Sequence, residues 1–390
     1  MKERVDQADS PVLSREKRIL SDSERLDWLR LIRSENIGPL TFQRLLARFG
    51  SAAAALEALP ELARRGGRPQ GLRICSPAAA KRELDATTAR GARLVASCEP
   101  DYPPLLAHID GVPPLLAIIG VADILARPTI AIVGTRNTSL NGRRLAEMLA
   151  RDLGVAGMIV VSGLARGIDA AAHRASLATG TVAVVAGGVD VVYPPEHREL
   201  QAEIAQRGVV VSEMPVGTQP QARHFPRRNR IIAGIARGVI VVEAACRSGS
   251  LITARCALEQ GRDVFAVPGS PLDPRARGAN DLLRQGAILT ESAEDVLREL
   301  PAACDNAPGL CASPSGSTPP APLPDLPDGD LATARQAIAE AMSPAPATVD
   351  EIIRNCQLSP AVVTSVLLEW ELAGRLERHP GNQVSLVAVV

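Results

Sequence analysis

The sequence lacks several features that would assign it to a common class of protein. Its seven cysteines include no C-x-x-C pair, which predicts reduced thiols and no structural zinc site. No apolar run approaches the roughly 18 residues that a bilayer-spanning helix needs. The charged first 20 residues contain no apolar core of a signal peptide. We therefore expect a soluble, cytoplasmic protein with no membrane partner and no metal.

Two nucleotide-binding motifs are also missing. No lysine follows Lys81, so the middle and end of the chain contain no G-x-x-x-x-G-K-[ST] P-loop. The first apolar run after residue 128 ends in a GTRN turn at 134–137, which lacks the second and third glycines of a dinucleotide-binding G-x-G-x-x-G. The sequence thus predicts no P-loop ATPase and no cofactor.

One long segment contains no negative charge. From Met214 to Val242 there is no Asp or Glu, but five arginines fall there: Arg223, Arg227, Arg228, Arg230 and Arg237. Residues 129–290 carry 19 Arg and 13 acidic residues, a net charge of +6, whereas residues 291–390 carry 5 Arg and 14 acidic residues, a net charge of −9. The basic middle predicts an anionic partner. Arginine suits bidentate phosphate contacts, although a GC-rich coding bias gives the same preference for Arg over Lys.

Shifts in composition predict the domain organisation. Residues 1–22 indicate a disordered leader, and apolar residues at three- and four-residue spacing predict a small helical domain, SAM-like or helix-hairpin-helix-like, over 23–93. Its hairpin at 37–40 either packs within the bundle or holds a DNA phosphate. Residues 301–328 include eight prolines and predict a linker. Residues 329–390 have the pattern of a winged helix.

Residues 94–300 predict an α/β domain. After a Pro-rich connection at 101–127, short apolar runs alternate with amphipathic helical stretches. The runs lie at 129–134, 158–163, 181–188, 209–214, 238–244 and 263–269. Near-continuous apolar strands separated by helices are typical of a parallel sheet covered on both faces. The pattern therefore predicts a Rossmann-like, doubly wound sheet.

The winged-helix pattern usually indicates duplex DNA binding, but its predicted recognition helix has the wrong charge. The stretch from Ser359 to Gly374 is mostly apolar, contains Glu369 and Glu371, and has no basic residue. Such a surface is repelled by the phosphates that line a major groove. We therefore expect this helix to serve protein interaction or packing, with duplex binding as the alternative.

The turns that follow the predicted strands contain the candidate site. In an open α/β sheet, ligands bind beyond the carboxyl ends of the strands. These turns combine glycine with hydroxyl or arginine side chains, which is the chemistry of an anion site. The candidates are Gly134, Thr135, Arg136, Asn137, Ser162, Gly163, Arg166, Gly167, Ser248, Gly249 and Ser250, with Phe225, Arg227, Arg228, Asn229 and Arg230 from the arginine-rich segment. We expect Asp169 to cap a helix, His173 to be a core or rim residue, and Cys246 to be inert; none predicts catalysis.

The order of the motifs resembles one known family. IVGTRN, VSGLARGIDAAAH, GGVDVVYPPEH, SEMPVG, FPRRNRIIAGIA and VVEAACRSGSLITARCALEQGRDVFAVPG, spread over roughly 92–287, are similar to the DNA-processing protein A family, DprA or Smf. The resemblance implies a homodimeric, non-enzymatic protein that binds and protects single-stranded DNA and loads the RecA recombinase in natural transformation. It implies DNA-facing roles for Arg136, Arg166 and Arg227 to Arg230, and places the glycine and serine candidates in DNA-facing loops. Phe225 is the best candidate for base stacking, with a core role as the alternative.

Two other functions remain open at this stage. A phosphoribohydrolase acting on nucleoside monophosphates uses a related fold, but no carboxylate follows Ser248 at the expected place, and Glu243 lies upstream. A scaffold protein would use its arginines only for internal salt bridges. Single-stranded DNA binding predicts a steep loss of affinity with salt, and that Arg228→Ala lowers the affinity and the salt slope. The acidic tail also motivates the hypothesis that it covers the basic site.

Overall fold

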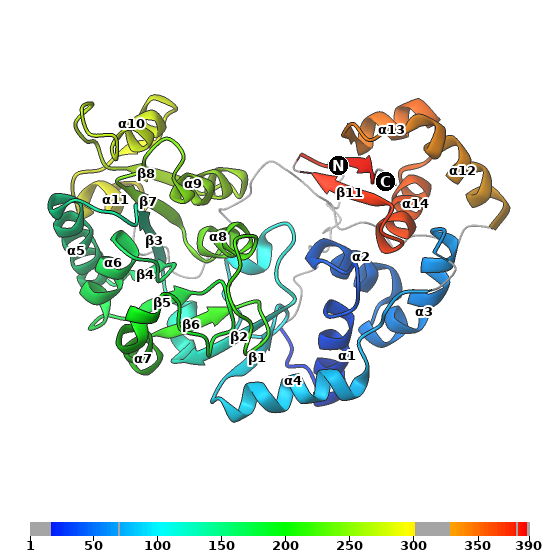
Figure 1. Ribbon diagram of the computed structural model, residues 1–390, viewed down its shortest axis with the longest axis horizontal. Helices are drawn as coiled ribbons and strands as arrows, with labels where there is room; N and C mark the ends of the chain where they lie inside the picture. Colours follow the sequence, from blue (N-terminus) through cyan, green and yellow to red (C-terminus); the bar gives the residue numbers. More distant parts are fainter. Residues whose placement is uncertain (1–16, 69–70, 301–327, 380, 388–390) are drawn as a thin grey trace, which may run out of the picture.

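The computed structural model describes residues 17–68, 71–300, 328–379 and 381–387. Most of the predicted leader and nearly all of the predicted linker lie outside these ranges. Leu20 is nevertheless buried, and Ser21 caps the first helix, so the helical domain begins a few residues before the predicted boundary at 23. In the ribbon view the Rossmann-like domain lies beside a second lobe that contains the helical domain and the winged helix (Figure 1).

The helical domain consists of α1 (Asp22–Ile32), α2 (Pro39–Phe49), α3 (Ala52–Arg65) and α4 (Pro77–Ala89). Local sequence signals set its helix ends. Ser21 and Glu24 form a capping box at α1, and Gly50 ends α2 in the left-handed region at φ 74°. Trp28 and Phe42 pack edge to face in the core, with ring centroids 5.1 Å apart.

The central sheet has nine strands in the order β1-β2-β6-β5-β4-β3-β7-β8-β9. The six predicted strands correspond to β3 (Thr129–Gly134), β4 (Ile159–Ser162), β5 (Thr181–Val184), β6 (Val209–Ser212), β7 (Gly238–Val242) and β8 (Asp263–Ala266), and all pair in parallel. β9 (Ile288–Leu289) extends this parallel part. β1 (Arg93–Ala96) and β2 (Leu115–Gly120) join antiparallel at the other edge. The predicted parallel sheet is confirmed, but β2 occupies part of the segment that we expected to be only a connection.

Helices cover both faces of the sheet, which confirms the doubly wound arrangement. Ile130 and Ile132 of β3 pack with α5 (Leu140–Val155), α6 (Ile168–Ser176) and α11 (Ala293–Glu299). Ala131 and Val133 pack on the opposite side with α8 (His224–Ile235), α9 (Gly249–Glu259) and α10 (Arg277–Arg284). The remaining helices of this domain are α7 (Arg198–Arg207) and the short η1 (Leu106–His108), η2 (Ala122–Ala126) and η3 (Pro195–His197). The strand order reverses between β3 and β7, where ligands bind in folds of this type.

The winged-helix domain contains α12 (Asp328–Ala341), α13 (Val349–Cys356) and α14 (Pro360–Leu372). Its wing is formed by β11 (Leu376–His379) and β12 (Gln383–Leu386), and β10 (Ala347–Thr348) completes a three-stranded sheet in the order β10-β12-β11. The predicted winged helix is confirmed, and α14 corresponds to its recognition helix.

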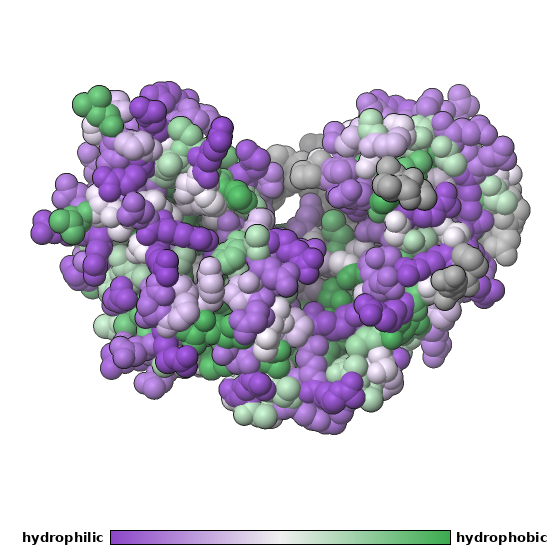
Figure 2. All heavy atoms as spheres, viewed as in Figure 1, coloured by the Kyte–Doolittle hydropathy of each residue, from purple (hydrophilic) through white to green (hydrophobic). Residues whose placement is uncertain are grey.

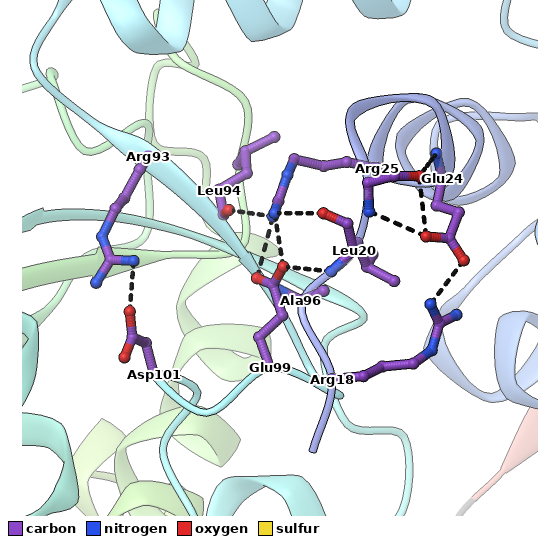
Figure 3. A network of polar contacts seen from close by, with 10 residues as sticks. Arg18, Leu20, Glu24, Arg25, Arg93, Leu94, Ala96, Glu99 and Asp101 are labelled. Atoms are coloured by element: carbon purple, nitrogen blue, oxygen red, sulfur yellow. Dashed lines mark hydrogen bonds and ion pairs between the residues drawn. The ribbon is translucent and has the colours of Figure 1, made fainter. Parts of the chain in front are cut away.

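A buried ion pair joins the helical domain to the sheet (Figure 3). The Arg25 guanidinium in α1 lies 2.6 Å from the Glu99 carboxylate and donates to the Leu94 carbonyl oxygen at 2.7 Å. Glu99 also accepts from the Ala96 and Leu20 amides. Burial acts to raise the pKa of Glu99, but the hydrogen bonds from Arg25 and the two amides outweigh it and hold the pKa below its usual value. The helical domain is therefore fixed to the edge of the sheet.

Within the described ranges, no helix combines the length and apolarity required to cross a membrane. Over the same residues, no three His, Cys, Asp or Glu side chains converge as metal ligands would.

Candidate nucleic-acid interface

The candidate site lies at the carboxyl edge of the parallel strands. The turns after β3, β4 and β7 meet the first turn of α8 there, because β3 pairs with β4 on one side and with β7 on the other. The Thr135 amide donates to the Glu243 carbonyl oxygen at 2.8 Å, and the Ile168 amide donates to the Thr135 carbonyl oxygen at 3.3 Å. Backbone hydrogen bonds thus hold the three turns together.

Two aromatic rings form a small platform at this edge. The Tyr193 and Phe225 ring centroids lie 5.8 Å apart, and Tyr193 is 46% exposed. The Arg136 guanidinium lies 5.3 Å from the Phe225 centroid, and that of Arg228 lies 5.9 Å from it. Residues from three segments far apart in the sequence therefore meet at this edge. We call Tyr193 and Phe225 the aromatic step, and the Arg136 and Arg228 guanidinium groups lie beside it. Such rings can stack on nucleobases.

Exposed arginines surround the aromatic step. Arg136, Arg166, Arg223, Arg227 and Arg247 all have exposed side chains. Arg166 pairs with Glu196, and the hydrogen bond that its guanidinium donates to this carboxylate raises the Arg166 pKa. Because both side chains are well exposed, the pair contributes little stability and can exchange for a phosphate. The first turn of α8 also contains no acidic residue, so its N-terminal amides leave positive charge at this edge.

Arg228 has a different environment from its neighbours. It is only 6% exposed, and its Nη1 donates to the carbonyl oxygens of Gly163 and Val184, the latter at 2.7 Å. Burial lowers its pKa to about 10, while the charge of Asp169 acts in the opposite direction. The guanidinium thus joins α8 to the ends of β4 and β5 from beneath the loops. This is the geometry of a residue that positions the site.

The other arginines of the segment also separate by environment. Arg230 pairs with Glu213 and donates to the Gly111 carbonyl oxygen at 2.6 Å, in a partly buried position. Arg237 lies just before β7, at the opposite edge of the sheet, where its amide donates to the Thr129 carbonyl oxygen. Only Arg223 and Arg227 of the five face solvent at the site. The scaffold hypothesis, in which the arginines serve only internal salt bridges, therefore fits Arg230 but does not explain the exposed Arg223 and Arg227.

The glycines of the loops are required mainly by packing within the protein. A Cβ atom at Gly134 would overlap the Val242 carbonyl oxygen, one at Gly163 would overlap the Arg228 guanidinium, and one at Gly167 would overlap the Thr135 carbonyl oxygen. At Gly249 a Cβ atom would meet no atom within 4 Å. Of the four predicted loop glycines, only Gly249 leaves open space beside its backbone.

The polar candidates are largely occupied by local hydrogen bonds. Ser162 donates to the Ile132 carbonyl oxygen at 2.6 Å and is fully buried. The Ser248 and Ser250 hydroxyls lie 2.7 Å apart, with Ser248 as the N-cap of α9. The Asn229 side chain donates to the Gly249 carbonyl oxygen at 3.2 Å, while the backbone N–H of Asn137, whose side chain is exposed, donates to the Thr135 hydroxyl. Apart from Asn137 these groups organise the loops. A direct DNA contact for any of them stays a prediction.

Glu243 is used for structure, which bears on the hydrolase alternative. It adopts a left-handed backbone at φ 56°, unusual for a residue with a side chain. Its carboxylate accepts hydrogen bonds from the Thr138 hydroxyl, the Ser139 amide and the Ser139 hydroxyl, the first two at 2.9 Å. The Glu243 carboxylate thus holds the start of α5 in place.

Asp169 does not cap its own helix, contrary to expectation. It lies in the first turn of α6, and its carboxylate accepts from the amides of Gly163 and Ala165 in the preceding loop, at 3.1 and 3.3 Å. Burial raises its pKa, and the nearby Arg228 acts against that shift. The carboxylate therefore fixes the loop that presents Arg166.

His173 is a core residue, as expected. Its Nδ1 lies 2.8 Å from the Thr181 hydroxyl, which itself donates to the Val160 carbonyl oxygen, so Nδ1 is the protonated nitrogen. Nε2 is buried without a hydrogen-bond partner. Burial, followed by the positive charges of His197, Arg228 and Arg174, lowers the His173 pKa to about 3.

This shift predicts acid sensitivity. The unfolded chain binds a proton at His173 near pH 6.5, whereas the folded chain binds it near pH 3. The stability associated with neutral His173 is therefore complete above pH 6.5 and is lost as the pH falls toward 3, by up to about 1.4 kcal/mol per pH unit. Urea unfolding followed by circular dichroism at pH 7 and pH 5 should show a smaller pH dependence for His173→Gln than for the parent. Equal pH dependences would contradict this role. The raised pKa of Asp169 changes stability with pH in the opposite direction, but Asp169 is present in both proteins, so its effect cancels in the comparison.

Sequence reasoning missed three residues at this edge. Tyr193 follows β5 in the YPPEH motif, and its exposure next to Phe225 was not visible from the pattern. Arg223 and Arg247 lie beside predicted candidates and carry exposed charge. An aromatic residue in a turn after a parallel strand, in a chain with so few aromatics, is the signal that could have identified Tyr193.

The chain matches three family models along its length. One described as DNA recombination-mediator protein A matches residues 93–301, one described as a DprA-like N-terminal HHH domain matches 22–86, and one described as a DprA winged helix domain matches 317–382. These three ranges follow the architecture described above.

Known proteins agree with the family models. Protein Smf of Escherichia coli is 40% identical over 297 residues, covering 73% of this chain and 75% of that protein. The X-ray structure of DNA processing protein A from Streptococcus pneumoniae aligns with a TM-score of 0.60 at 37% identity, covering 72% of this chain and 99% of that one. A structure from Helicobacter pylori that addresses the single-stranded DNA binding mode of its DNA processing protein A aligns with a TM-score of 0.50 at 27% identity, covering 54% and 95%. The chain belongs to the DprA/Smf family of DNA-processing proteins.

Proposed function

We propose that the carboxyl edge of the sheet binds single-stranded DNA without regard to sequence. The observation that carries this proposal is the aromatic step of Tyr193 and Phe225, with the Arg136 guanidinium 5.3 Å from one ring. Unpaired bases have free faces for stacking, and their phosphates attract the exposed arginines nearby. The family membership and the Helicobacter pylori relative support the same ligand.

The chemistry favours a single strand over a duplex. In a duplex the base faces are covered by neighbouring base pairs, so the aromatic step would gain nothing and only the charge attraction would remain. We infer a binding role rather than a catalytic one, because Glu243 is held by Thr138 and Ser139.

The finer roles follow from the family alone. We propose that the protein acts as a cytoplasmic homodimer, protects incoming single-stranded DNA during natural transformation, and loads the RecA recombinase onto it. The exposed Arg136, Arg166 and Arg227 would contact the strand, together with Arg223 and Arg247. The buried Arg228 would hold the loops in place, which revises the effect that we expect from its replacement.

A salt titration tests the binding proposal. The logarithm of the affinity for a fluorescent oligo(dT) should fall steeply and linearly with the logarithm of salt concentration. Arg227→Ala removes one exposed cation and should lower the magnitude of that slope by about 0.7. Arg151→Ala is a matched control, since Arg151 is exposed near the end of α5, at the opposite edge of the sheet. Binding that does not depend on salt, or equal slope changes for both variants, would overturn the proposal.

A further inference from the structure

The recognition helix of the winged-helix domain is covered by the helical domain of the same chain. In the ribbon view α14 lies against α2 and α3, although about 300 residues separate them in sequence (Figure 1). In the space-filling view the lobe that contains both is separated from the upper part of the Rossmann-like domain by a hollow (Figure 2). The helix that reads the major groove in duplex-binding winged helices therefore faces protein here.

The face of α14 that points away from the core of the winged helix is also apolar and buried. Val363, Val366 and Trp370 point into the winged helix's own core. Leu368 and Leu372, one turn apart, are 0% exposed and belong to the core of the helical domain. A helix that is apolar around most of its circumference must be buried on both sides. This explains why the predicted recognition helix contains so little polar sequence.

Polar groups from the two domains pair across the contact. Asn36 donates to the Leu372 carbonyl oxygen at 3.0 Å, which satisfies a carbonyl at the end of α14. Thr41 donates to the Glu371 carboxylate at 2.6 Å, and Arg375 donates to the Gly66 carbonyl oxygen at 3.3 Å. The partners on the helical domain lie in the hairpin between α1 and α2, the first turn of α2 and the end of α3.

Charge is also matched across this contact. Glu371 lies 3.7 Å from Arg44 of α2 and 2.7 Å from Arg378 of β11. Burial lowers the Arg44 pKa to about 10, with the nearby Arg378 acting in the same direction and Glu371 acting against it. Glu371, whose charge is unsuited to a DNA groove, thus forms ion pairs with Arg44 and Arg378. It also withdraws Arg44 from any phosphate near the hairpin.

Backbone fit makes the contact specific. Gly66 ends α3 at φ −70° and ψ −4°, a conformation open to any residue. A Cβ atom at this position would overlap the Glu369 carbonyl oxygen and lie 2.9 Å from the Ala373 Cβ. The helical domain alone therefore gives no reason for glycine at this position, whereas the approach of α14 does.

We propose that α14 is a docking helix: the winged-helix domain uses its recognition surface to bind the α1–α2 hairpin and the end of α3 in its own chain. Two elements of types that contact DNA in other proteins, a helical hairpin and a recognition helix, cover each other. DNA binding is thereby confined to the Rossmann-like domain. The acidic winged helix is directed toward the helical domain rather than over the basic edge, which differs from the self-inhibitor hypothesis.

Gly66→Ala in the full-length chain tests this proposal. The methyl group fits the backbone of α3 but not the docked α14, so the two domains should separate. Hydrogen exchange of the peptides that cover 34–44 and 366–375 should become about tenfold faster. Glu57→Ala is the control, because Glu57 is exposed on α3 and makes none of the contacts described above, and it should leave exchange unchanged. Arg44→Glu places a negative charge opposite Glu371 and should also make exchange of both peptides faster. Agreement between the two variants shows that the effect does not come from a folding defect at Gly66.

Duplex DNA binding distinguishes docking from masking. If α14 is a docking helix, Gly66→Ala and Arg44→Glu increase exchange but gain no affinity for a 30-base-pair duplex in a gel shift (a length of roughly three helical turns). Unchanged exchange in both variants would mean that the domains do not dock through this surface. Faster exchange accompanied by new duplex binding would make α14 a masked DNA reader and would also overturn the proposal. Neither result affects the single-stranded DNA site on the other domain.

Discussion

Phe225→Ala is expected to weaken binding of oligo(dT) by about 5- to 160-fold at constant salt, corresponding to the roughly 1–3 kcal/mol that one stacked base contributes. The Phe225 ring is the centre of the aromatic step: Tyr193 packs on it, and Arg136 and Arg228 lie within 6 Å of its centroid. Its loss removes a stacking face and leaves Arg136 without its support. Fluorescence anisotropy with oligo(dT) measures the change.

The salt slope separates stacking from charge in this experiment. Phe225→Ala removes no charge, so the affinity should fall by a similar factor at every salt concentration while the slope is retained. Phe225→Tyr keeps an aromatic ring and should bind within about twofold to threefold of the parent. If Phe225→Ala binds as tightly as the parent, the ring is a packing residue, and the aromatic step is not part of the interface.

Arg228→Met is expected to destabilise the Rossmann-like domain by roughly 2–6 kcal/mol, because it leaves two buried carbonyl oxygens without their donor. The substitution removes the hydrogen bonds to the Gly163 and Val184 carbonyl oxygens and the cation near the buried Asp169. The loop that carries Arg166 loses its support from below. Oligo(dT) binding should therefore fall together with stability, although Arg228 itself does not face solvent.

Two details sharpen the measurement on Arg228. Both tryptophans, Trp28 and Trp370, lie outside the Rossmann-like domain, so urea unfolding should be followed by circular dichroism rather than by tryptophan fluorescence. The double variant Arg228→Met with Asp169→Asn removes both charges and should recover part of the lost stability. A single variant as stable as the parent would show that Arg228 does not hold the loops.

The fold could be predicted from the sequence because its signals are local. Apolar runs of six to eight residues between amphipathic stretches identify β3 to β8, and their continuity indicates burial on both faces. β2 was missed because Leu115–Gly120 directly follows two prolines and pairs antiparallel with a distant strand. β9 has only two residues, and its pairing with β8 depends on the tertiary fold.

The sequence predicted which turns form the candidate site, but not how the environments of their side chains differ. The rule that ligands bind at the carboxyl edge predicted that these turns lie together, and the structure places the turns after β3, β4 and β7 side by side. It could not distinguish adjacent residues of one helix: Arg227 faces solvent, whereas Arg228 is buried and Arg230 is paired with Glu213. Helical periodicity gives relative directions, but the depth of each side chain depends on neighbouring loops. Tyr193 joined the site only because its turn folds back over α8.

The winged helix shows the same difference between what the sequence predicts and what depends on tertiary contacts. Its sequence indicated that the recognition helix is unsuited to DNA, since Glu369 and Glu371 are its only charged residues. What the helix binds instead depends on surface fit, above all at Gly66, and no pattern within either domain encodes that contact.

Competition between single-stranded and duplex DNA tests the central claim most directly. The full-length protein, bound to fluorescent oligo(dT), is titrated with unlabelled oligo(dT) or with a duplex of the same length, at two salt concentrations. An edge built from an aromatic step and exposed arginines predicts that the single strand competes at least about tenfold better, with a preference that persists at high salt because stacking is less sensitive to salt than charge. Equal competition by the duplex would contradict the account, since charge alone would then explain the binding.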